Sequence, residues 1–303
     1  MTITLQESLR AVFYAPFYLA LARGAFEREG VEIQFVSAPS PGEAGHAVMS
    51  GAVDVSWGGP MRVMETYELN STCDLVCFAE VVTRDPFILV GRAPRPSFSL
   101  ADLAALRVGT VSEVPTPWLC LQHDLRQAGI DPGTINRVTD RTMAENCAAL
   151  RDGTLDVVQV FEPFASQAVE ADAGHVWYSA ADRGPTSYTT FYTRRATLKA
   201  RRAELMSMVR AIWRTQQWVA AATAGDIAQG IAGYFPTLNR QILEAACARY
   251  KALGIWGRDP ILPSAGYERL RQSLVSGMFA QTGTPFEVAV DNSLAEEVIR
   301  STA

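Results

Sequence analysis

Lysine is scarce in this 303-residue sequence: Lys199 and Lys251 are the only two among 27 basic residues. The formal net charge is −5, and no basic stripe with interleaved aromatic residues is present. Proteins that bind nucleic acids generally carry such a stripe, so we expect no nucleic-acid partner. The shortage of lysine also leaves few side chains that could hold an aldehyde cofactor as a Schiff base.

Paired cysteine motifs are absent as well. The five cysteines are Cys73, Cys77, Cys120, Cys147 and Cys247. None forms the CxxC spacing of a zinc site or a thioredoxin-like motif, and the odd, unpatterned set favours a reducing compartment over a disulfide framework. The three histidines are His46, His123 and His175. They are isolated from one another in the sequence, so core or helix-surface roles are favoured over a metal site.

Long apolar runs and a recognisable secretion signal are also missing. No segment approaches the length of a transmembrane helix, and Met1 leads directly into TITLQES without a basic region and an apolar core. Two locations therefore stay open: the periplasm if a leader has been removed, and the cytoplasm if Met1 is the native start. We also expect a monomer.

What the sequence does contain is a regular alternation of strand-like and helix-like segments. Its length and its 48% hydrophobic content suit a globular chain of about two domains. The expected strands cover 3–8, 31–38, 53–57 and 73–82 in a first series, and 106–111, 135–139, 155–161 and 175–179 in a second. Helical patterns fill the intervals and dominate after residue 198. This alternation predicts βαβ units and mostly parallel sheets.

Two segments interrupt the rhythm and predict a two-lobe architecture. Asp85-Pro86 begins a proline-rich stretch, and 186–195 (TSYTTFYTRR) resembles a second crossing strand. We therefore predict an α/β fold of the periplasmic-binding-protein type II kind, in which each lobe is a mostly parallel sheet flanked by helices. Lobe I comprises 1–85 plus 187–303, and lobe II comprises 86–186. Two hinge crossings join the lobes, with a ligand cleft between them.

Four loops at predicted strand ends carry the candidate ligand contacts, because open α/β sheets bind ligands there. After the first strand, Phe13 and Tyr14 either contact a ligand or pack in the core. After the third strand, Trp57 offers a stacking face, and the paired Gly58 and Gly59 let a ligand approach the backbone. A plain tight turn has the same pattern.

The other two loops belong to the second series. In VSEVPTPW, Ser112 and Thr116 lie at the start of a helix whose backbone amides attract anions, although helix capping alone also explains them. In FEPF, Glu162 stands between two aromatic residues and before a proline. We interpret Glu162 as a cleft carboxylate that accepts hydrogen bonds from a ligand amine, with Phe161 providing a ring contact. A charged residue on an ordinary loop is the alternative.

The complete set of candidate ligand-binding residues is Phe13, Tyr14, Trp57, Gly58, Gly59, Arg62, Ser112, Glu113, Thr116, Phe161, Glu162 and Tyr188. No catalytic residue is assigned. We expect Glu162→Gln to weaken binding roughly ten- to a hundredfold and to leave folding nearly unchanged. We expect Trp57→Ala to weaken binding through lost stacking.

The order of several motifs resembles one protein family. The motifs are FYLALARGAFEREGVEIQFV, VMSGAVDVSWGG, LADLAALRVGTV, LRDGTLDVVQVFEPFAS and AELMSMVRAIWRTQQWV. Over roughly the first 235 residues they are similar to solute-binding proteins of the ABC importers for sulfonates, nitrate, taurine and thiamine-pyrimidine precursors. Fungal thiamine pyrimidine synthase belongs to the same family. The resemblance implies that Glu162 matches a glutamate that binds the amino edge of a pyrimidine.

Two departures from the synthase branch bear on cofactors. That branch has a lysine and a histidine after the third strand, where this chain has Gly58 and Arg62. Its cysteine-rich iron motif corresponds here to 185–195, which contains no cysteine. The resemblance therefore implies neither a pyridoxal cofactor nor a metal.

The leading hypothesis is a non-catalytic protein that captures a small aromatic, pyrimidine-like or sulfonate-type metabolite for an ABC permease. The alternative is an enzyme on the same scaffold, such as a synthase, decarboxylase or desulfinase, because fold does not fix function. Its nearest candidate groups are Cys120, His123 and Glu113, with core packing favoured for Cys120. A regulatory binding module is a third class, but no helix-turn-helix or linker pattern supports it.

Overall fold

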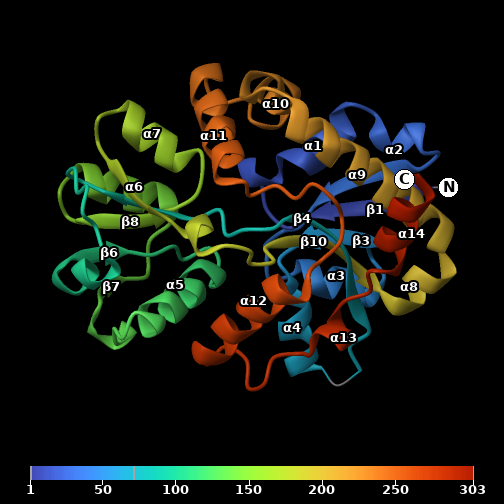
Figure 1. Ribbon diagram of the computed structural model, residues 1–303, viewed down its shortest axis with the longest axis horizontal. Coiled ribbons are helices and arrows are strands. Elements are labelled where there is room, and N and C mark those ends of the chain that lie inside the picture. The colour runs from blue at the N-terminus through green and yellow to red at the C-terminus, as the bar shows by residue number, and fades with distance from the viewer. Residues whose placement is uncertain (1, 71, 303) are drawn as a thin grey trace.

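Two five-stranded sheets, each flanked by helices, make up the computed structural model, which describes residues 2–70 and 72–302 (Figure 1). The first sheet contains β1 (Thr2–Glu7), β2 (Glu32–Ser37), β3 (Val55–Gly58), β4 (Leu75–Val82) and β10 (Thr189–Arg194). The second contains β5 (Ile88–Gly91), β6 (Arg107–Gly109), β7 (Asn136–Val138), β8 (Val157–Val160) and β9 (His175–Ser179). The predicted α/β class is confirmed.

The helices follow the same division. The first strand series is connected by η1 (Val12–Tyr14), α1 (Ala15–Ala22), α2 (Ala25–Arg28), α3 (Ala44–Ser50) and α4 (Pro60–Leu69). The second is connected by η2 (Leu100–Ala105), α5 (Thr116–Gln127), η3 (Pro132–Thr134), α6 (Met143–Arg151), α7 (Phe164–Glu170) and η4 (Ala180–Arg183). The chain then ends in α8 (Arg195–Ala200), α9 (Arg202–Ala221), α10 (Ala224–Ile231), η5 (Ala232–Tyr234), α11 (Arg240–Leu253), α12 (Ser264–Ser276), α13 (Phe286–Ala289) and α14 (Ser293–Thr302).

Both sheets are mixed, and each contains a single reversed strand. The strand orders are β2-β1-β3-β10-β4 and β7-β6-β8-β5-β9. In the first sheet β10 is antiparallel to both of its neighbours, and in the second β5 is antiparallel to both of its neighbours. The reversed strands are the two that follow the passages of the chain from one sheet to the other. The remaining strands of each sheet run in one direction, which matches the predicted mostly parallel arrangement.

The passages between the sheets are short. One joins β4 to β5 across 83–87, and the other joins β9 to β10 across 180–188 and includes η4. Every strand of the first sheet lies within 1–85 or 187–303, and every strand of the second lies within 86–186. We keep these lobe boundaries as a proposal.

Two helices of the C-terminal region reach across to the second sheet. Helix α11 packs against α7, and α12 packs against α5 (Figure 1). Arg249 of α11 binds Glu162, which lies two residues before α7, and His123 of α5 contacts Ser276 of α12. The lobes are therefore held together on both sides of the region between the sheets.

A helix that spans a bilayer needs about 20 apolar residues. Within residues 2–70 and 72–302, no helix combines the length and the hydropathy that this requires.

Candidate functional site

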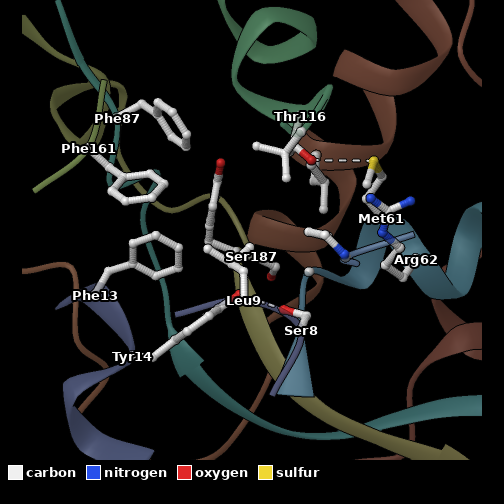
Figure 2. Close-up of a pocket in the computed structure, with 15 residues that line it drawn as sticks. Ser8, Leu9, Phe13, Tyr14, Met61, Arg62, Phe87, Thr116, Phe161 and Ser187 are labelled. Atoms are coloured by element: carbon white, nitrogen blue, oxygen red, sulfur yellow. Dashed lines mark hydrogen bonds between the residues drawn. The ribbon is translucent and has the colours of Figure 1, made fainter. Parts of the chain in front are cut away.

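A pocket lies where the loops after β1, β3, β6 and β8 meet the two passages between the sheets (Figure 2). Its lining consists of Ser8, Leu9, Phe13, Tyr14, Pro41, Gly59, Met61, Arg62, Phe87, Val114, Thr116, Phe161, Ser187, Tyr188 and Leu270. A pocket between two lobes is a usual place for a small ligand.

One wall of the pocket is aromatic. Phe161 meets Phe13 and Phe87 edge to face, with both pairs of ring centroids 5.3 Å apart. Tyr188 lies beside Phe13 at a centroid distance of 6.1 Å. Figure 2 shows the three phenylalanine rings together on one side of the pocket. Because aromatic rings pack well in such edge and offset geometries, this wall suits a flat apolar ligand body.

The opposite side of the pocket carries polar groups among apolar side chains. Arg62 has only 11% of its side chain exposed, and its Nη1 donates to Glu65 Oε2 at 2.6 Å. The Thr116 hydroxyl donates to the Met61 sulfur at 3.3 Å, which links α5 of the second lobe to α4 of the first (Figure 2). Ser8 shares a 3.0 Å hydrogen bond with Tyr14.

Two helices begin at this polar side. Helix α4 starts at Pro60 after Gly59, and α5 starts at Thr116 after Pro115; no side chain caps either N-terminus. The first backbone N–H groups of an α-helix have no partner within the helix, and the helix dipole adds partial positive charge there. Such ends attract anions. The pocket thus brings one helix N-terminus from each lobe to the side that carries Arg62.

The phenols of the lining are neutral. Burial raises the pKa of Tyr14 to about 12 and raises the pKa of Tyr188 well above its usual value. In the described chain, Arg62 is the one residue of the lining with a formal charge, and no carboxylate is among them. Arg62 is itself paired with Glu65, so the features of the pocket that suit an anion are the remaining N–H groups of this guanidinium and the two uncapped helix N-termini.

The structure brings many of the predicted site residues together. Those that line the pocket are Phe13, Tyr14, Gly59, Arg62, Thr116, Phe161 and Tyr188. Those that do not are Trp57, Gly58, Ser112, Glu113 and Glu162. Each residue of the second group has a structural partner that accounts for its position.

Trp57 is completely buried and does not face the pocket. Its ring stacks on Phe17 at a centroid distance of 4.6 Å and on Phe35 at 5.4 Å. Side chains alternate along a strand, and Trp57, next to the last residue of β3, points to the face that α1 covers. The expectation that Trp57 stacks on a ligand is therefore wrong, because the surfaces of its ring are already used.

Gly58 points to the other face of β3 but lies below the pocket. A Cβ atom there would lie 3.3 Å from the Tyr192 ring and 3.5 Å from Ser8 Oγ. The residue therefore leaves space for two side chains under the pocket, whereas the adjacent Gly59 is part of the lining.

Glu162 is fully buried and has protein partners at both carboxylate oxygens. Oε2 accepts from the Ser166 backbone N–H at 2.9 Å, and Oε1 accepts from the Ser166 hydroxyl at 2.9 Å and from Arg249 Nε at 2.6 Å. Its own N–H donates to the Tyr250 hydroxyl at 2.8 Å. The expectation that this carboxylate accepts hydrogen bonds from a ligand amine is wrong, because Glu162 joins α7 to α11.

Ser112 and Glu113 are exposed and connect the loop after β6 to the start of α6. The Ser112 N–H donates to the Arg141 carbonyl at 3.2 Å, and Glu113 Oε1 accepts from the Met143 N–H at 2.9 Å. The expected contribution of these two side chains to the cleft is therefore not found.

The candidate catalytic groups also lie outside the pocket lining. Cys120 is buried, and burial raises the pKa of its thiol to about 12. His123 contacts Ser276 Oγ through Nδ1 at 3.2 Å, and burial lowers its pKa. Among the residues that the structure describes, no three histidine, cysteine or acidic side chains gather as a metal site would require.

Several lining residues were not predicted from the sequence. They are Ser8, Leu9, Pro41, Met61, Phe87, Val114, Ser187 and Leu270. Phe87 and Ser187 belong to the passages between the lobes. The breaks in the alternation of strands and helices at these two places could have indicated them. Leu270 comes from α12, and no local pattern indicates that this helix reaches the pocket.

The two-lobe arrangement with a pocket at the passages between the sheets defines a fold shared by solute-binding proteins of import systems. The sulfonate-binding protein SsuA of a candidate ABC transporter from Methylobacillus flagellatus KT aligns with a TM-score of 0.79 at 12% identity, covering 100% of this chain and 94% of that chain. The nitrate-binding protein NrtA from Synechocystis PCC 6803 aligns with a TM-score of 0.72 at 13% identity, covering 99% and 88%. The desulfurization enzyme DSZB aligns with a TM-score of 0.70 at 14% identity, covering 100% and 99%.

Sequence similarity identifies the family within this fold. The model of the NMT1-like family matches residues 9–232, which is most of the chain, and the chain belongs to this family. This match confirms the resemblance seen in the sequence motifs. A candidate binding protein, YtlA from Bacillus subtilis (strain 168), is 25% identical over 298 residues, covering 98% of this chain and 89% of that protein.

Proposed function

We propose that this protein is a solute-binding protein that captures a small aromatic anion, such as an arene sulfonate or carboxylate, and presents it to an ABC permease. One observation carries the proposal. The pocket has an aromatic wall on one side, and Arg62 and two helix N-termini on the other. The described lining contains no carboxylate.

The expected contacts divide the ligand into two parts. The aromatic body lies against Phe13, Phe87 and Phe161, where burial of apolar surface contributes about 25 cal/mol per Å². The anionic group takes hydrogen bonds from Arg62 and Thr116. Because Thr116 and Arg62 belong to different lobes, one anion contacts both lobes and stabilises the closed arrangement.

A positively charged amine or an amino-pyrimidine is a weaker candidate. The residue expected to accept its hydrogen bonds, Glu162, is bonded to Ser166 and Arg249 instead. No other carboxylate in the described lining replaces it.

The known relatives support the proposal at the level of function class. SsuA and NrtA are binding proteins for anions, and YtlA is a candidate binding protein. On this basis we propose a permease as the partner, the periplasm as the place of action and a monomer as the working form. The match to DSZB keeps an enzyme on this scaffold as the alternative, but no cysteine, histidine or lysine is among the described lining residues to act as a nucleophile or base.

Calorimetric titration with matched ligands tests the proposal. We expect benzenesulfonate and benzoate to bind, and the cation benzylammonium and the non-aromatic methanesulfonate to bind much more weakly. Arg62→Gln should weaken benzenesulfonate binding about ten- to a hundredfold, the range expected for loss of a charged hydrogen bond. Arg107→Gln, which removes an arginine paired with Asp156 in the second lobe, is the control and should bind as wild type does. Equal or tighter binding of benzylammonium, or an unchanged affinity in Arg62→Gln, would contradict the proposal.

A further inference from the structure

Ser187 presents an unpaired hydroxyl at the pocket. The residue is fully buried, it belongs to the lining, and its Oγ has no hydrogen-bond partner among the described residues. Its backbone N–H donates to the Gly266 carbonyl of α12 at 3.1 Å, and a Cβ at Gly266 would lie 3.1 Å from Ser187 Oγ. Buried hydroxyls normally have partners, so this one is placed to receive its partner from a neighbour or from a ligand.

Glu80 of β4 pairs with Thr190 of β10, three residues beyond Ser187, and its carboxyl is close enough for the Ser187 hydroxyl to lower its pKa. It is 1% exposed, it forms no ion pair in the described chain, and its Oε1 has no hydrogen-bond partner. Burial raises the pKa of this carboxyl to about 8, the nearby Ser187 hydroxyl lowers it, and the negative charge of Asp259 raises it again. Cys77 on the same strand also faces Glu80, and burial keeps that thiol protonated. Burial therefore favours the protonated form of Glu80.

The other buried carboxylates of the chain are different. Glu7 is paired with Arg10, Asp85 with Arg183, and Glu162 with Arg249. A buried carboxylate without a cation is costly, and the cost falls when the group takes up a proton. Glu80 is the buried carboxyl near the pocket that has no cation as a partner among the described residues. Because protonation lowers the cost of burying it, its proton is the feature that a functional role would use.

We propose that Glu80 is a positioning residue that acts through Ser187 to set the preference of the pocket for anions. This inference rests on the proposed binding of an aromatic anion. A protonated Glu80 donates to Ser187 Oγ, and the Ser187 hydroxyl then donates into the pocket. An ionised Glu80 accepts the Ser187 proton instead, so that Ser187 presents lone pairs to the ligand and a second negative charge lies behind them.

The proposal gives a definite pH dependence. As pH rises through the range in which Glu80 ionises, anion affinity falls. The phenols of the lining do not titrate in this range, because the pKa of Tyr14 is about 12 and that of Tyr188 is raised well above its usual value. The described lining therefore contains no other group that would produce the same profile.

The experiment is titration of benzenesulfonate into wild type, Glu80→Gln and Ser187→Ala from about pH 6 to about pH 9.5. Wild type should lose about tenfold in affinity across this range, the size expected for one hydrogen bond to a charged group. Glu80→Gln, which cannot ionise, should keep a nearly flat profile. Ser187→Ala should bind more weakly at low pH, and adding Glu80→Gln to it should change little. An infrared band of a protonated carboxyl, present in wild type at pH 7 and lost in Glu80→Gln, provides a readout without ligand.

The outcomes separate this inference from the proposed function. If benzenesulfonate binds but wild type and Glu80→Gln share one pH profile, the role of Glu80 is overturned and anion binding stands. An absent carboxyl band overturns the role of Glu80 as well. If no aromatic anion binds at either end of the pH range, both proposals fail. Thermal unfolding of each variant checks that it is folded at both pH values.

Discussion

Two corners of the molecule, β3–α4 in the first lobe and β8–α7 in the second, are built alike and use their residues in opposite ways. Each is a buried strand followed by a short turn and a helix, with a proline at the start of the helix: Pro60 is the first residue of α4, and Pro163 directly precedes α7. At the first corner the aromatic residue, Trp57, is buried away from the pocket and the charged residue, Arg62, lines it. At the second the aromatic residue, Phe161, lines the pocket and the charged residue, Glu162, is buried against Arg249.

The difference follows from where each strand ends. Trp57 is inside β3 (Val55–Gly58), so the alternation of side chains assigns it to the α1 side of the sheet. Phe161 is the first residue after β8 (Val157–Val160), where the strand alternation no longer applies. Trp57 lies one residue before the last residue of β3, and Phe161 lies one residue after the last residue of β8, so the strand fixes the direction of the first ring but not of the second. The location of a binding loop can be predicted more safely than the side chains that enter the pocket.

Trp57→Ala should produce the largest effect, and it should be on folding. Removing a buried tryptophan that stacks on Phe17 and Phe35 should lower the free energy of unfolding by about 3–5 kcal/mol. Urea unfolding measures this loss, and titration of the folded fraction should show nearly wild-type affinity for benzenesulfonate. A variant that keeps wild-type stability but loses affinity would restore Trp57 as a ligand contact and remove the contrast between the corners.

Glu162→Gln should also act on stability, by about 1–3 kcal/mol. An amide cannot accept from Ser166 and Arg249 as the carboxylate does, because one of its two ends is a donor. This expectation reverses the one that the sequence alone suggested. Arg249→Gln is the matched variant, since it removes the other partner of the same ion pair. Tenfold weaker benzenesulfonate binding at unchanged stability would return Glu162 to the binding site.

Much of the fold and part of the site could be predicted from the sequence, for physical reasons that these corners illustrate. Strand and helix periodicity is local, so the two series of strands and the interruption at Asp85-Pro86 could be recognised. The partners of a buried carboxylate are not local: Arg249 lies 87 positions from Glu162. Nothing near FEPF indicates this arginine, and the same holds for Met143 as the partner of Glu113. Gly59 and Thr116, which were expected from their places at strand ends, are in the pocket lining; their contact with a ligand stays a prediction.

Glu162 is a buried carboxylate paired with an arginine, whereas Glu80 is a buried carboxyl without a cation in the described chain. We expect the contribution of Glu80 to the free energy of unfolding to depend on pH. The usual pKa of a glutamate, 4.5, applies to the unfolded chain, and burial raises the folded pKa to about 8. Between these values the folded state holds a proton that the unfolded state has lost, so stability falls as pH rises, by at most about 1.4 kcal/mol per pH unit. Above about pH 8 Glu80 adds no further slope. The difference in unfolding free energy between wild type and Glu80→Gln, measured by urea unfolding from about pH 5 to about pH 9, should show this slope. A constant difference would mean that Glu80 is ionised in the folded protein throughout.

The smallest expected effect is the difference in ligand affinity between substitutions of the two phenylalanines of FEPF, Phe161 and Phe164. Phe161 lines the pocket, whereas Phe164 is the first residue of α7, is only partly buried and does not belong to the lining. Their rings lie 6.0 Å apart, so both positions share one hydrophobic environment. Phe161→Leu keeps an apolar side chain but removes the ring face and edge that a bound aromatic ligand would meet. Aromatic contacts contribute about 0.5–1.5 kcal/mol beyond burial, which corresponds to roughly two- to twelvefold weaker benzenesulfonate binding. Phe164→Leu should bind within about twofold of wild type, because no ligand contact is lost. Equal losses in the two variants would show that FEPF supports the pocket as a rigid unit, and that the position of one aromatic side chain after the end of β8 does not decide binding.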